Sequence, residues 1–170
     1  MPKTFSEVLS DINNKSKTSL LICVTMLIAA AVLLLTQYSV GWLFAIMGAM
    51  LAASLYSKHQ RTKKELSKVD DFDSFCSQYD SASTKLELLA LTITDEYAVI
   101  TLPYLQIFPL NDMDIFEVGL QGDIRKALFL TDKSGKRHKI AETQKGDALQ
   151  EEFDKAYEAV RAYFNNRQDA

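Results

Sequence analysis

The sequence predicts a helical membrane hairpin followed by an α+β domain, in which an antiparallel sheet is closed by a C-terminal helix. Three observations predict this fold class. No charged residue occurs between Lys17 and Lys58. Short apolar and β-branched stretches, separated by turn-sized connections, fill residues 85–140. From Asp147 onward, apolar residues recur at helical spacing.

The average composition hides a division of charge between the two parts of the chain. The 170 residues are 48% hydrophobic and 24% charged, which would suit a soluble enzyme. Residues 1–64 carry seven Lys or Arg and two acids, a net charge of +5, whereas residues 65–170 carry twelve and twenty, a net charge of −8. This pattern excludes a single soluble globule, a disordered chain and a protein that binds nucleic acid through bulk charge.

Two apolar stretches predict two membrane-spanning helices, residues 18–36 and 40–56, which form a hairpin over residues 18–56. The first has nineteen residues, which at about 1.5 Å per residue match the ~30 Å hydrocarbon core of a bilayer. Only three residues separate the stretches, so we expect a tight turn. Buried helices of a soluble protein are the alternative, but such helices rarely lack charge over so long a segment.

Residues 1–17 are predicted to be an amphipathic N-terminal segment. Thr4-Phe5-Ser6-Glu7 matches a capping box, and Phe5, Val8, Leu9 and Ile12 follow at helical spacing. We expect a short helix that ends at Asn13-Asn14. It would either lie in the headgroup layer of the membrane or pack on the soluble domain.

Lysine and arginine flank both predicted spans and are absent from the turn between them. Both termini are therefore expected to be cytoplasmic, in a multi-pass protein of the cell (inner) membrane. A juxtamembrane basic cluster follows the second span and consists of Lys58, Arg61, Lys63 and Lys64. Each charge contributes roughly 1 kcal/mol near an anionic leaflet, so the cluster can hold the linker on the membrane. The alternative is that it acts only as a topology signal.

Small residues recur at four-residue spacing in the second span, at Ala45, Gly48, Ala49 and Ala52. Such a stripe lets helix backbones approach closely. We expect it to pack against the first span of the same chain, and a homodimer through these residues is the alternative. Neither span contains an ionisable side chain of the kind that lines a transport path, which argues against a stand-alone transporter.

Residues 57–84 are predicted to be a juxtamembrane helix and linker. No Gly or Pro occurs between Gly48 and Pro103, so the second span is expected to continue as a helix beyond Tyr56. Phe72, Phe75 and Tyr79 then repeat on one helical face, and residues 80–84 are typical of a loop.

Residues 85–170 are predicted to form a cytoplasmic sheet with a C-terminal helix. Apolar, β-branched and aromatic residues predict six strands, at 85–93, 97–101, 104–108, 115–120, 126–131 and 136–140. Their short connections favour an antiparallel meander, with residues 132–135 as a hairpin turn. Asp147 is expected to cap the final helix, whose apolar stripe includes Phe153 and Val160.

Parts of this region resemble uncharacterised small bacterial membrane proteins that have an N-terminal two-helix hairpin. The similar stretches are LTITDEYAVI-TLPYLQIFPLNDMDIFEVG, KALFLTDKSGKRHKI and the terminal helix. They share the "TDEY" turn, a strand that ends at Pro109-Leu110-Asn111-Asp112, and a hairpin like "T.DGK" from Thr131 to Lys136. The resemblance covers roughly residues 85–165. It implies a cytoplasmic domain with the pleckstrin-homology-like (PH-like) fold, in which a curved sheet is closed by the helix, and it implies no catalytic residue or ligand.

No catalytic, cofactor-binding or metal-binding motif is recognised, so the protein is predicted not to be an enzyme and to carry no cofactor. His59 and His138 lack metal-ligand spacing to each other and to Cys23 or Cys76. The sequence also lacks the nucleophile elbow, the HExxH zinc motif and the Walker A loop.

One predicted hairpin gathers positive charge in the otherwise acidic domain, at Lys133, Lys136, Arg137 and Lys139. Contact with anionic lipid or an acidic partner is one hypothesis, and a solvated hairpin is the other. The sequence thus predicts an integral membrane protein that presents a non-enzymatic interaction domain, as a scaffold or accessory protein with a protein partner. The alternatives are an anionic-lipid-binding or lipid-sensing protein and an accessory subunit of a transporter or membrane enzyme. Nucleic acid is not an expected partner.

Overall fold

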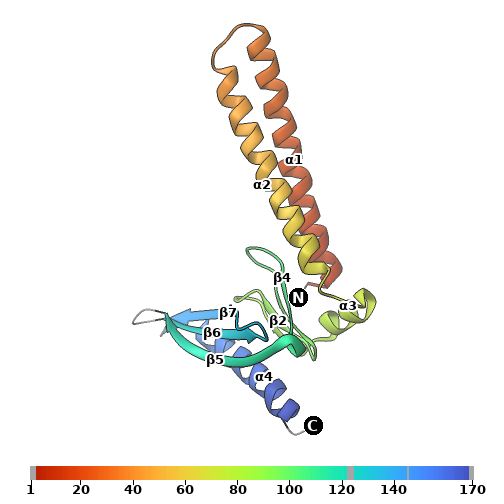
Figure 1. Cartoon of the computed structure of the whole chain (residues 1–170), viewed down its shortest axis with the longest axis vertical. Coiled ribbons are helices and arrows are strands. Elements are labelled where there is room, and N and C mark those ends of the chain that lie inside the picture. The colour runs from red at the N-terminus through yellow and green to blue at the C-terminus, as the bar shows by residue number, and fades with distance from the viewer. Residues whose placement is uncertain (1–2, 122–124, 145, 169–170) are drawn as a thin grey trace. The chain divides into compact units, whose positions relative to one another are not determined.

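The computed structural model describes residues 3–121, 125–144 and 146–168. Its helices and strands are drawn in Figure 1. The chain divides into two compact units. Ser6–Lys64 form the first, which we call the hairpin unit. The chain up to Phe5 together with the chain from Glu65 onward forms the second, which we call the sheet domain.

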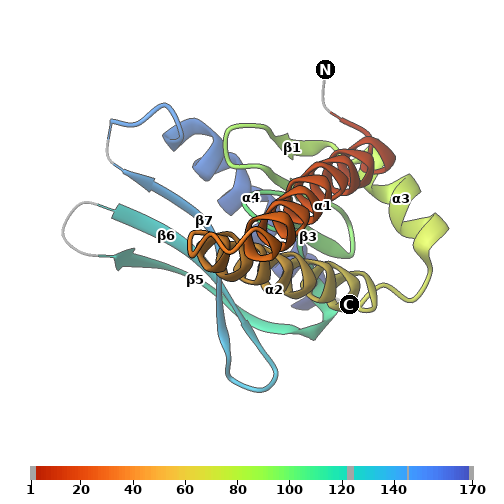
Figure 2. The same cartoon turned by 90° about the horizontal axis from the view of Figure 1, so that it is seen from above.

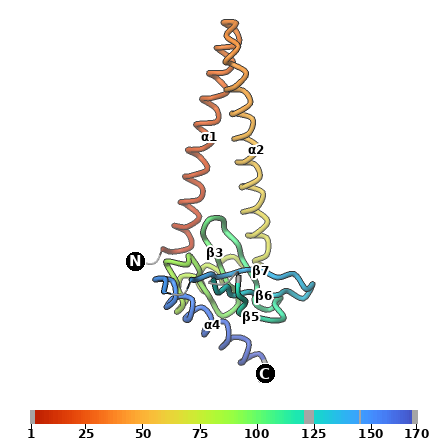
Figure 3. Tube along the Cα trace, turned by 90° about the vertical axis from the view of Figure 1, so that its left-hand side faces the viewer, coloured from red at the N-terminus to blue at the C-terminus, as the bar shows by residue number. Residues whose placement is uncertain are grey.

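The hairpin unit consists of two long helices, α1 (Phe5–Leu35) and α2 (Gly41–Leu66). They lie side by side and run antiparallel on either side of a short turn (Figure 3). α1 begins directly after Thr4, where the capping box predicts a start, but the expected end at Asn13-Asn14 is wrong. The helix continues because asparagine in a helix interior costs only a fraction of a kcal/mol. The predicted continuation of the second helix beyond Tyr56 is confirmed.

Among the described helices, α1 alone meets the criteria of length and apolar composition for crossing a membrane. Only 11% of its most apolar window is buried, whereas a core helix of a soluble protein would be mostly buried. α2 is less hydropathic because its apolar half contains Gly, Ala and Ser, whose small side chains contribute little.

The sheet domain begins with α3 (Phe72–Ser81), and Asp71 caps this helix. The Asp71 carboxylate accepts hydrogen bonds from the backbone N–H groups of Asp73 and Ser74 at 3.0 and 3.2 Å. The predicted apolar face of the helix is confirmed at Phe75 and Tyr79, which are buried.

Phe5 packs on α3 and is completely buried. The centroid of its ring lies 4.8 Å from that of Phe75 and 5.0 Å from that of Tyr79. The Phe5 backbone N–H also donates to Asp80 Oδ1 at 2.8 Å. Of the two locations expected for the N-terminal segment, Phe5 therefore takes the one on the soluble domain.

The first sheet is an antiparallel meander in the order β1 (Thr84–Leu86), β2 (Leu91–Ile93), β3 (Tyr97–Ile100) and β4 (Gln106–Pro109). The prediction of one strand over residues 85–93 is wrong, because a turn at 87–90 folds β2 back on β1 so that Leu86 pairs with Leu91. That turn contains no Gly, Pro, Asn or Asp, the residues that usually mark a turn.

A 3-10 turn (Leu110–Asp112) leads to the second sheet, in the order β5 (Met113–Gln121), β6 (Arg125–Asp132) and β7 (Arg137–Gln144). Figure 2 shows these three strands side by side. Both neighbouring pairs are antiparallel, which confirms the predicted meander. The predicted hairpin turn after Thr131 is also confirmed, and Gly135 adopts the positive φ of 83° that the turn requires.

The C-terminal helix α4 (Gln150–Gln168) packs on the core formed by the two sheets. Phe153 and Val160 are buried as predicted, in one cluster with Leu91 of β2 and Leu128 of β6. The predicted cap at Asp147 is wrong. The helix begins three residues later, and the Asp147 carbonyl accepts from the Gln150 N–H at 3.1 Å within the preceding turn.

Polar contacts fix both ends of α4 to the strands. Glu152 Oε2 accepts from the Leu89 N–H in the β1–β2 turn at 3.0 Å. At the other end, Tyr163 donates to Asn111 Oδ1 at 2.6 Å, and Arg167 donates to the Met113 carbonyl at 2.8 Å. The helix thereby holds the first sheet at one end and the junction between the sheets at the other.

An ion pair covers the outer edge of β4. Glu65 Oε2 accepts from the Ile107 N–H at 2.8 Å, and Lys68 donates to the Ile107 carbonyl at 3.0 Å. Glu65 and Lys68 also bind each other at 2.5 Å. β4 is the last strand of its sheet, so these side chains satisfy backbone groups that no further strand pairs with.

Candidate interaction surfaces

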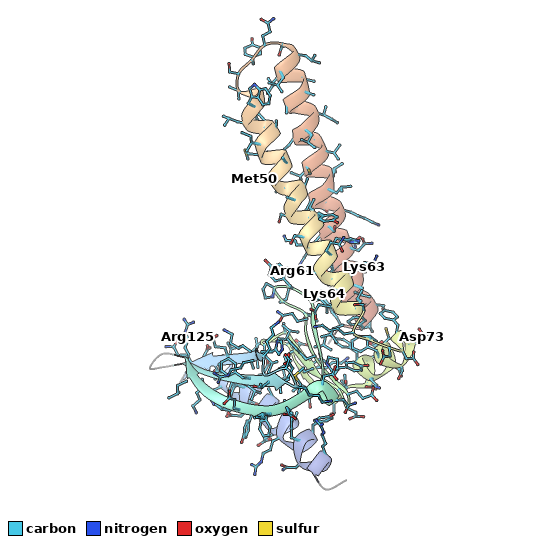
Figure 4. The ribbon with its side chains drawn as sticks, viewed as in Figure 1. Met50, Arg61, Lys63, Lys64, Asp73 and Arg125 are labelled. Carbon is cyan, nitrogen blue, oxygen red and sulfur yellow. The ribbon has the colours of Figure 1, made fainter. Side chains whose placement is uncertain are left out.

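The largest exposed apolar surface belongs to the hairpin unit, where large side chains project outward along both helices (Figure 4). The exposed residues include Leu21, Ile28 and Leu35 on α1 and Leu43, Ile46 and Met50 on α2. Met50, labelled in Figure 4, is 69% exposed. Contiguous apolar surface of this extent marks a membrane or protein contact.

Two glycines of α2 form the seam between the helices. A Cβ atom on Gly48 would lie 2.7 Å from Leu27 Cδ2, and one on Gly41 would lie 2.8 Å from Leu34 Cγ. The Cys23 thiol also donates to the Gly48 carbonyl at 3.3 Å. Gly41 thus faces Leu34 and Gly48 faces Leu27, which fixes the antiparallel register of the two helices.

The predicted small-residue stripe is divided between this seam and the surface. Gly48 is buried and Ala45 is half-buried, whereas Ala49 and Ala52 are exposed. Gly48 thus makes the intramolecular contact that we expected, and the homodimer contact stays a prediction for the exposed alanines.

Threonine hydroxyls in and next to the apolar part of α1 donate to backbone carbonyls of the preceding turn. The hydroxyls of Thr25 and Thr36 donate to the carbonyls of Leu21 and Val32 at 2.9 and 3.0 Å. Thr18 donates in the same way to Asn14. In a bilayer, where water offers no partner, hydroxyls need such internal acceptors.

The charged residues nearest to the apolar surface lie at the same level on the two helices. The register set by the glycine contacts places Lys17 of α1 opposite Lys58 of α2. The juxtamembrane basic cluster continues from there along α2, and Lys58, Arg61, Lys63 and Lys64 are all exposed. Figure 4 shows the last three near the end of that helix.

In the sheet domain, Asp132 organises the predicted basic hairpin. Its carboxylate accepts from the Ser134 hydroxyl at 2.5 Å, from the Lys136 N–H at 3.0 Å, and lies 2.8 Å from His138 Nε2. These hydrogen bonds, that of the Ser134 hydroxyl first and that of His138 next, hold the pKa of Asp132 well below its usual range. The carboxylate and the histidine therefore stabilise a turn.

The four basic residues of the predicted hairpin site do not form a single surface. Arg137 pairs with Glu117 at 2.6 Å and stacks on the Phe129 ring, 3.7 Å from its centroid. Lys139 pairs with Glu142, and the hydrogen bond from Lys139 lowers the pKa of that glutamate. Within the part of the chain that the structure describes, Lys133 and Lys136 make no ion pair and lie exposed at the turn.

Two exposed apolar groups of the sheet domain were not predicted from the sequence. Ile115, Val118 and Leu120 lie along β5, an edge strand. Leu88 and Leu102 lie in the two turns at one end of the first sheet. The sequence did not mark these residues, because exposure depends on which neighbouring residues the fold covers.

Among residues 3–121, 125–144 and 146–168, no three His, Cys, Asp or Glu side chains gather closely enough to hold a metal ion.

Comparison with protein-family models, curated proteins and solved structures finds no match to this chain.

Proposed function

We propose that this protein is a membrane-anchored, non-enzymatic interaction protein. In this proposal α1 and α2 cross the cell membrane as a hairpin, both termini are cytoplasmic, and the sheet domain binds a protein partner at the cytoplasmic leaflet. The observation that carries the proposal is the apolar surface exposed along both helices of the hairpin unit.

The packing of the hairpin unit supports a second span. α2 lies along α1 in the register fixed by Gly41 and Gly48, so a bilayer that receives α1 receives α2 with it. The residues that lower the hydropathy of the apolar half of α2 include these seam glycines, while large residues such as Leu43 and Met50 are exposed there. The low hydropathy of this half of α2 therefore comes partly from buried residues that would not face lipid.

The distribution of charge supports the proposed orientation. Lys17 and Lys58 bound the uncharged region at one level, and the turn at residues 36–40 carries no charge. Positively charged flanks remain on the cytoplasmic side of a membrane. Both ends of the hairpin unit, and with them the sheet domain, are then cytoplasmic.

The topology of the sheet domain supports the PH-like fold. Two antiparallel meanders, of four and three strands, are followed by a C-terminal helix that packs on both. Such a domain presents exposed strand edges and loops on which a partner can dock, and the apolar side chains along β5 are one surface of that kind.

The structural roles of the acidic side chains support a function in binding rather than in catalysis. Asp71 caps a helix, Asp132 holds a turn, and Glu152 holds the β1–β2 turn. The ion pairs of Arg137 and Lys139 weigh against anionic lipid as the ligand of the basic hairpin, because both cations already face a carboxylate.

The proposal is tested by photo-crosslinking the full chain in its native membrane. A photoreactive residue at Val118 on β5 should give one discrete adduct of reproducible mass, identified by mass spectrometry. The matched control carries the same residue at Glu158, an exposed position of α4, and should give none. Recovery of the chain in the soluble fraction contradicts the anchor, and a membrane-bound chain without an adduct at Val118 contradicts the partner contact on β5.

A further inference from the structure

Two neighbouring turns of the first sheet expose apolar side chains at one end of that sheet. Leu88 of the β1–β2 turn is 62% exposed and Leu102 of the β3–β4 turn is 59% exposed. Pro103 and Tyr104 follow Leu102 and are also exposed. We call these four residues the apolar loop tip. The β3–β4 turn is the green loop beside the β4 label in Figure 1.

The two turns are bound into one structure. The Ala90 carbonyl accepts from the Thr101 N–H at 2.9 Å and from the Thr101 hydroxyl at 3.3 Å. Ala90 adopts a left-handed φ of 50° to present this carbonyl, a conformation that costs a non-glycine residue free energy. Leu105 on the inner side of the same turn is buried, whereas Leu102 is left outside. The exposure is therefore fixed by the fold.

The acids of the first sheet gather mainly at its opposite end. Asp95 and Glu96 form the β2–β3 turn. Gln78 of α3 donates to Glu96 Oε2 at 3.0 Å, which brings that acidic helix to the same end. Two acids also lie at the end that carries the tip: Glu87 in the β1–β2 turn, and Glu152 of α4, whose carboxylate accepts from the Leu89 N–H at 3.0 Å. The four residues of the tip itself carry no charge, so the tip suits an apolar surface.

The helical segment between the predicted second span and the sheet domain limits the distance of the sheet domain from the membrane. Nine residue-to-residue steps lead from Tyr56, the end of the predicted second span, to Glu65, the start of the sheet domain, and residues 57–64 lie between them. All of them are helical, so at about 1.5 Å per residue the attachment point is about 13 Å from the end of the span. Each headgroup layer is roughly 5–8 Å deep, so the sheet domain is attached within about 10 Å of the outer limit of that layer.

We propose that the apolar loop tip inserts into the interface of the membrane that holds the hairpin unit, as a second contact of the sheet domain with lipid. The inference rests on the proposed function, because it needs the anchor. Leucine and tyrosine side chains are the groups that enter the boundary between headgroups and acyl chains, to a depth of about 5–10 Å. The occupant is the bilayer interface, and it requires no specific headgroup.

The test uses tryptophan fluorescence of the full chain in vesicles of phosphatidylcholine and phosphatidylglycerol. The chain has one tryptophan, Trp42, so the wild type reports on the anchor. Leu102→Trp and Leu88→Trp, each combined with Trp42→Phe, report on the tip. Ser134→Trp in the same background is the matched control, at the exposed turn of the basic hairpin.

Brominated phosphatidylcholine should quench tryptophan at positions 102 and 88 and shift its emission to the blue. Bromine near the headgroup should quench more strongly than bromine near the chain ends. Tryptophan at position 134 should stay unquenched. Quenching of Trp42 without quenching at 102 and 88 overturns this inference and leaves the proposed anchor standing. Absence of quenching at Trp42 overturns both. Equal quenching at 134 overturns the inference by showing adsorption of the whole domain.

Discussion

Gly48 and Leu27 meet across the seam of the hairpin unit with no room for a methyl group. At the scale of single residues, the side chains that decide the structure are often small or polar. Asp132 is an example from the sheet domain, where one carboxylate closes a turn and holds His138. Substitutions at Gly48 and Asp132 test whether these single residues stabilise the hairpin unit and the sheet domain.

Gly48→Leu should loosen the hairpin, because the new side chain collides with Leu27. Overpacking of this kind costs about 1–3 kcal/mol. The midpoint of unfolding by SDS titration in mixed micelles should fall accordingly. Ala49→Leu, one residue further on an exposed face, should leave the midpoint unchanged. An equal effect of both variants would contradict the assigned seam.

The stability that Asp132 contributes should depend on pH. Its pKa is lowered in the folded state, so the contribution is complete above the unfolded pKa of about 3.9 and is lost as the pH falls through the folded pKa. The difference in melting temperature between the wild type and Asp132→Asn should therefore be constant near neutral pH and shrink below about pH 4. Asp114→Asn, at an exposed position of β5, is the matched control for the removal of one carboxylate.

At the scale of elements, β4 and α4 show how the edges and the core of the sheet domain are completed. β4 has no strand on its outer side, and the ion pair of Glu65 and Lys68 takes the backbone groups of Ile107. α4 contributes Phe153 and Val160 to the core of both sheets. Side chains that precede β4 in the sequence satisfy its edge, whereas α4 is held by the burial of its apolar residues.

Removal of the Glu65 carboxylate should weaken the protection of the β4 edge. Glu65→Ala leaves the Ile107 N–H without its acceptor, which costs about 1–3 kcal/mol for a buried donor. Hydrogen exchange at the Ile107 amide should accelerate markedly, while amides of β6 keep their protection. Glu65→Gln retains an acceptor oxygen and should keep most of the protection. Unchanged exchange in Glu65→Ala would show that this contact does not protect the edge.

Phe153→Ala should destabilise the sheet domain strongly, because the ring is 3% exposed in the core. Such truncations cost about 3–5 kcal/mol, out of a total of about 5–15 kcal/mol for a domain. The melting temperature of the full chain in detergent should drop by many degrees. Glu158→Ala on the exposed side of α4 should change it little, and a similar small change in Phe153→Ala would argue against its place in the core.

At the scale of the whole molecule, the chain joins an uncharged helical hairpin to an acidic domain through a short basic segment. The proposed orientation follows from that order, because the cations mark the cytoplasmic side. The hairpin unit leaves its apolar surface exposed, as the proposed anchor requires, whereas the sheet domain buries its own core.

Labelling of single cysteines tests the orientation. In a chain with Cys23 and Cys76 changed to Ser, Ser39→Cys in the hairpin turn should react with a membrane-impermeant maleimide added outside intact spheroplasts. Ser134→Cys in the sheet domain should react only after lysis. A reporter fused after Ala170 should be active in its cytoplasmic form. The reverse labelling pattern would invert the topology, and labelling of both before lysis would exclude the hairpin as a barrier-spanning anchor.

Periodicity and charge predicted most elements of the chain, because these signals are local. The continuous second helix, the meander, the 132–135 turn and the buried positions Phe153 and Val160 all follow from residue spacing. The turn at residues 87–90 was missed because no turn residue marks it. It is held by the contacts of Leu89 with Glu152 and of Ala90 with Thr101, residues distant in the sequence.

The basic hairpin shows the same limit for a candidate site. Its positive residues are plain in the sequence, but their partners are on other strands. Arg137 meets Glu117 and Phe129 only because β5, β6 and β7 align in this register. The sequence by itself determined an apolar hairpin with charged flanks, since composition sets the solvent that a helix requires. The tertiary structure decided which side chains stay exposed, because exposure and pairing depend on what the rest of the chain covers.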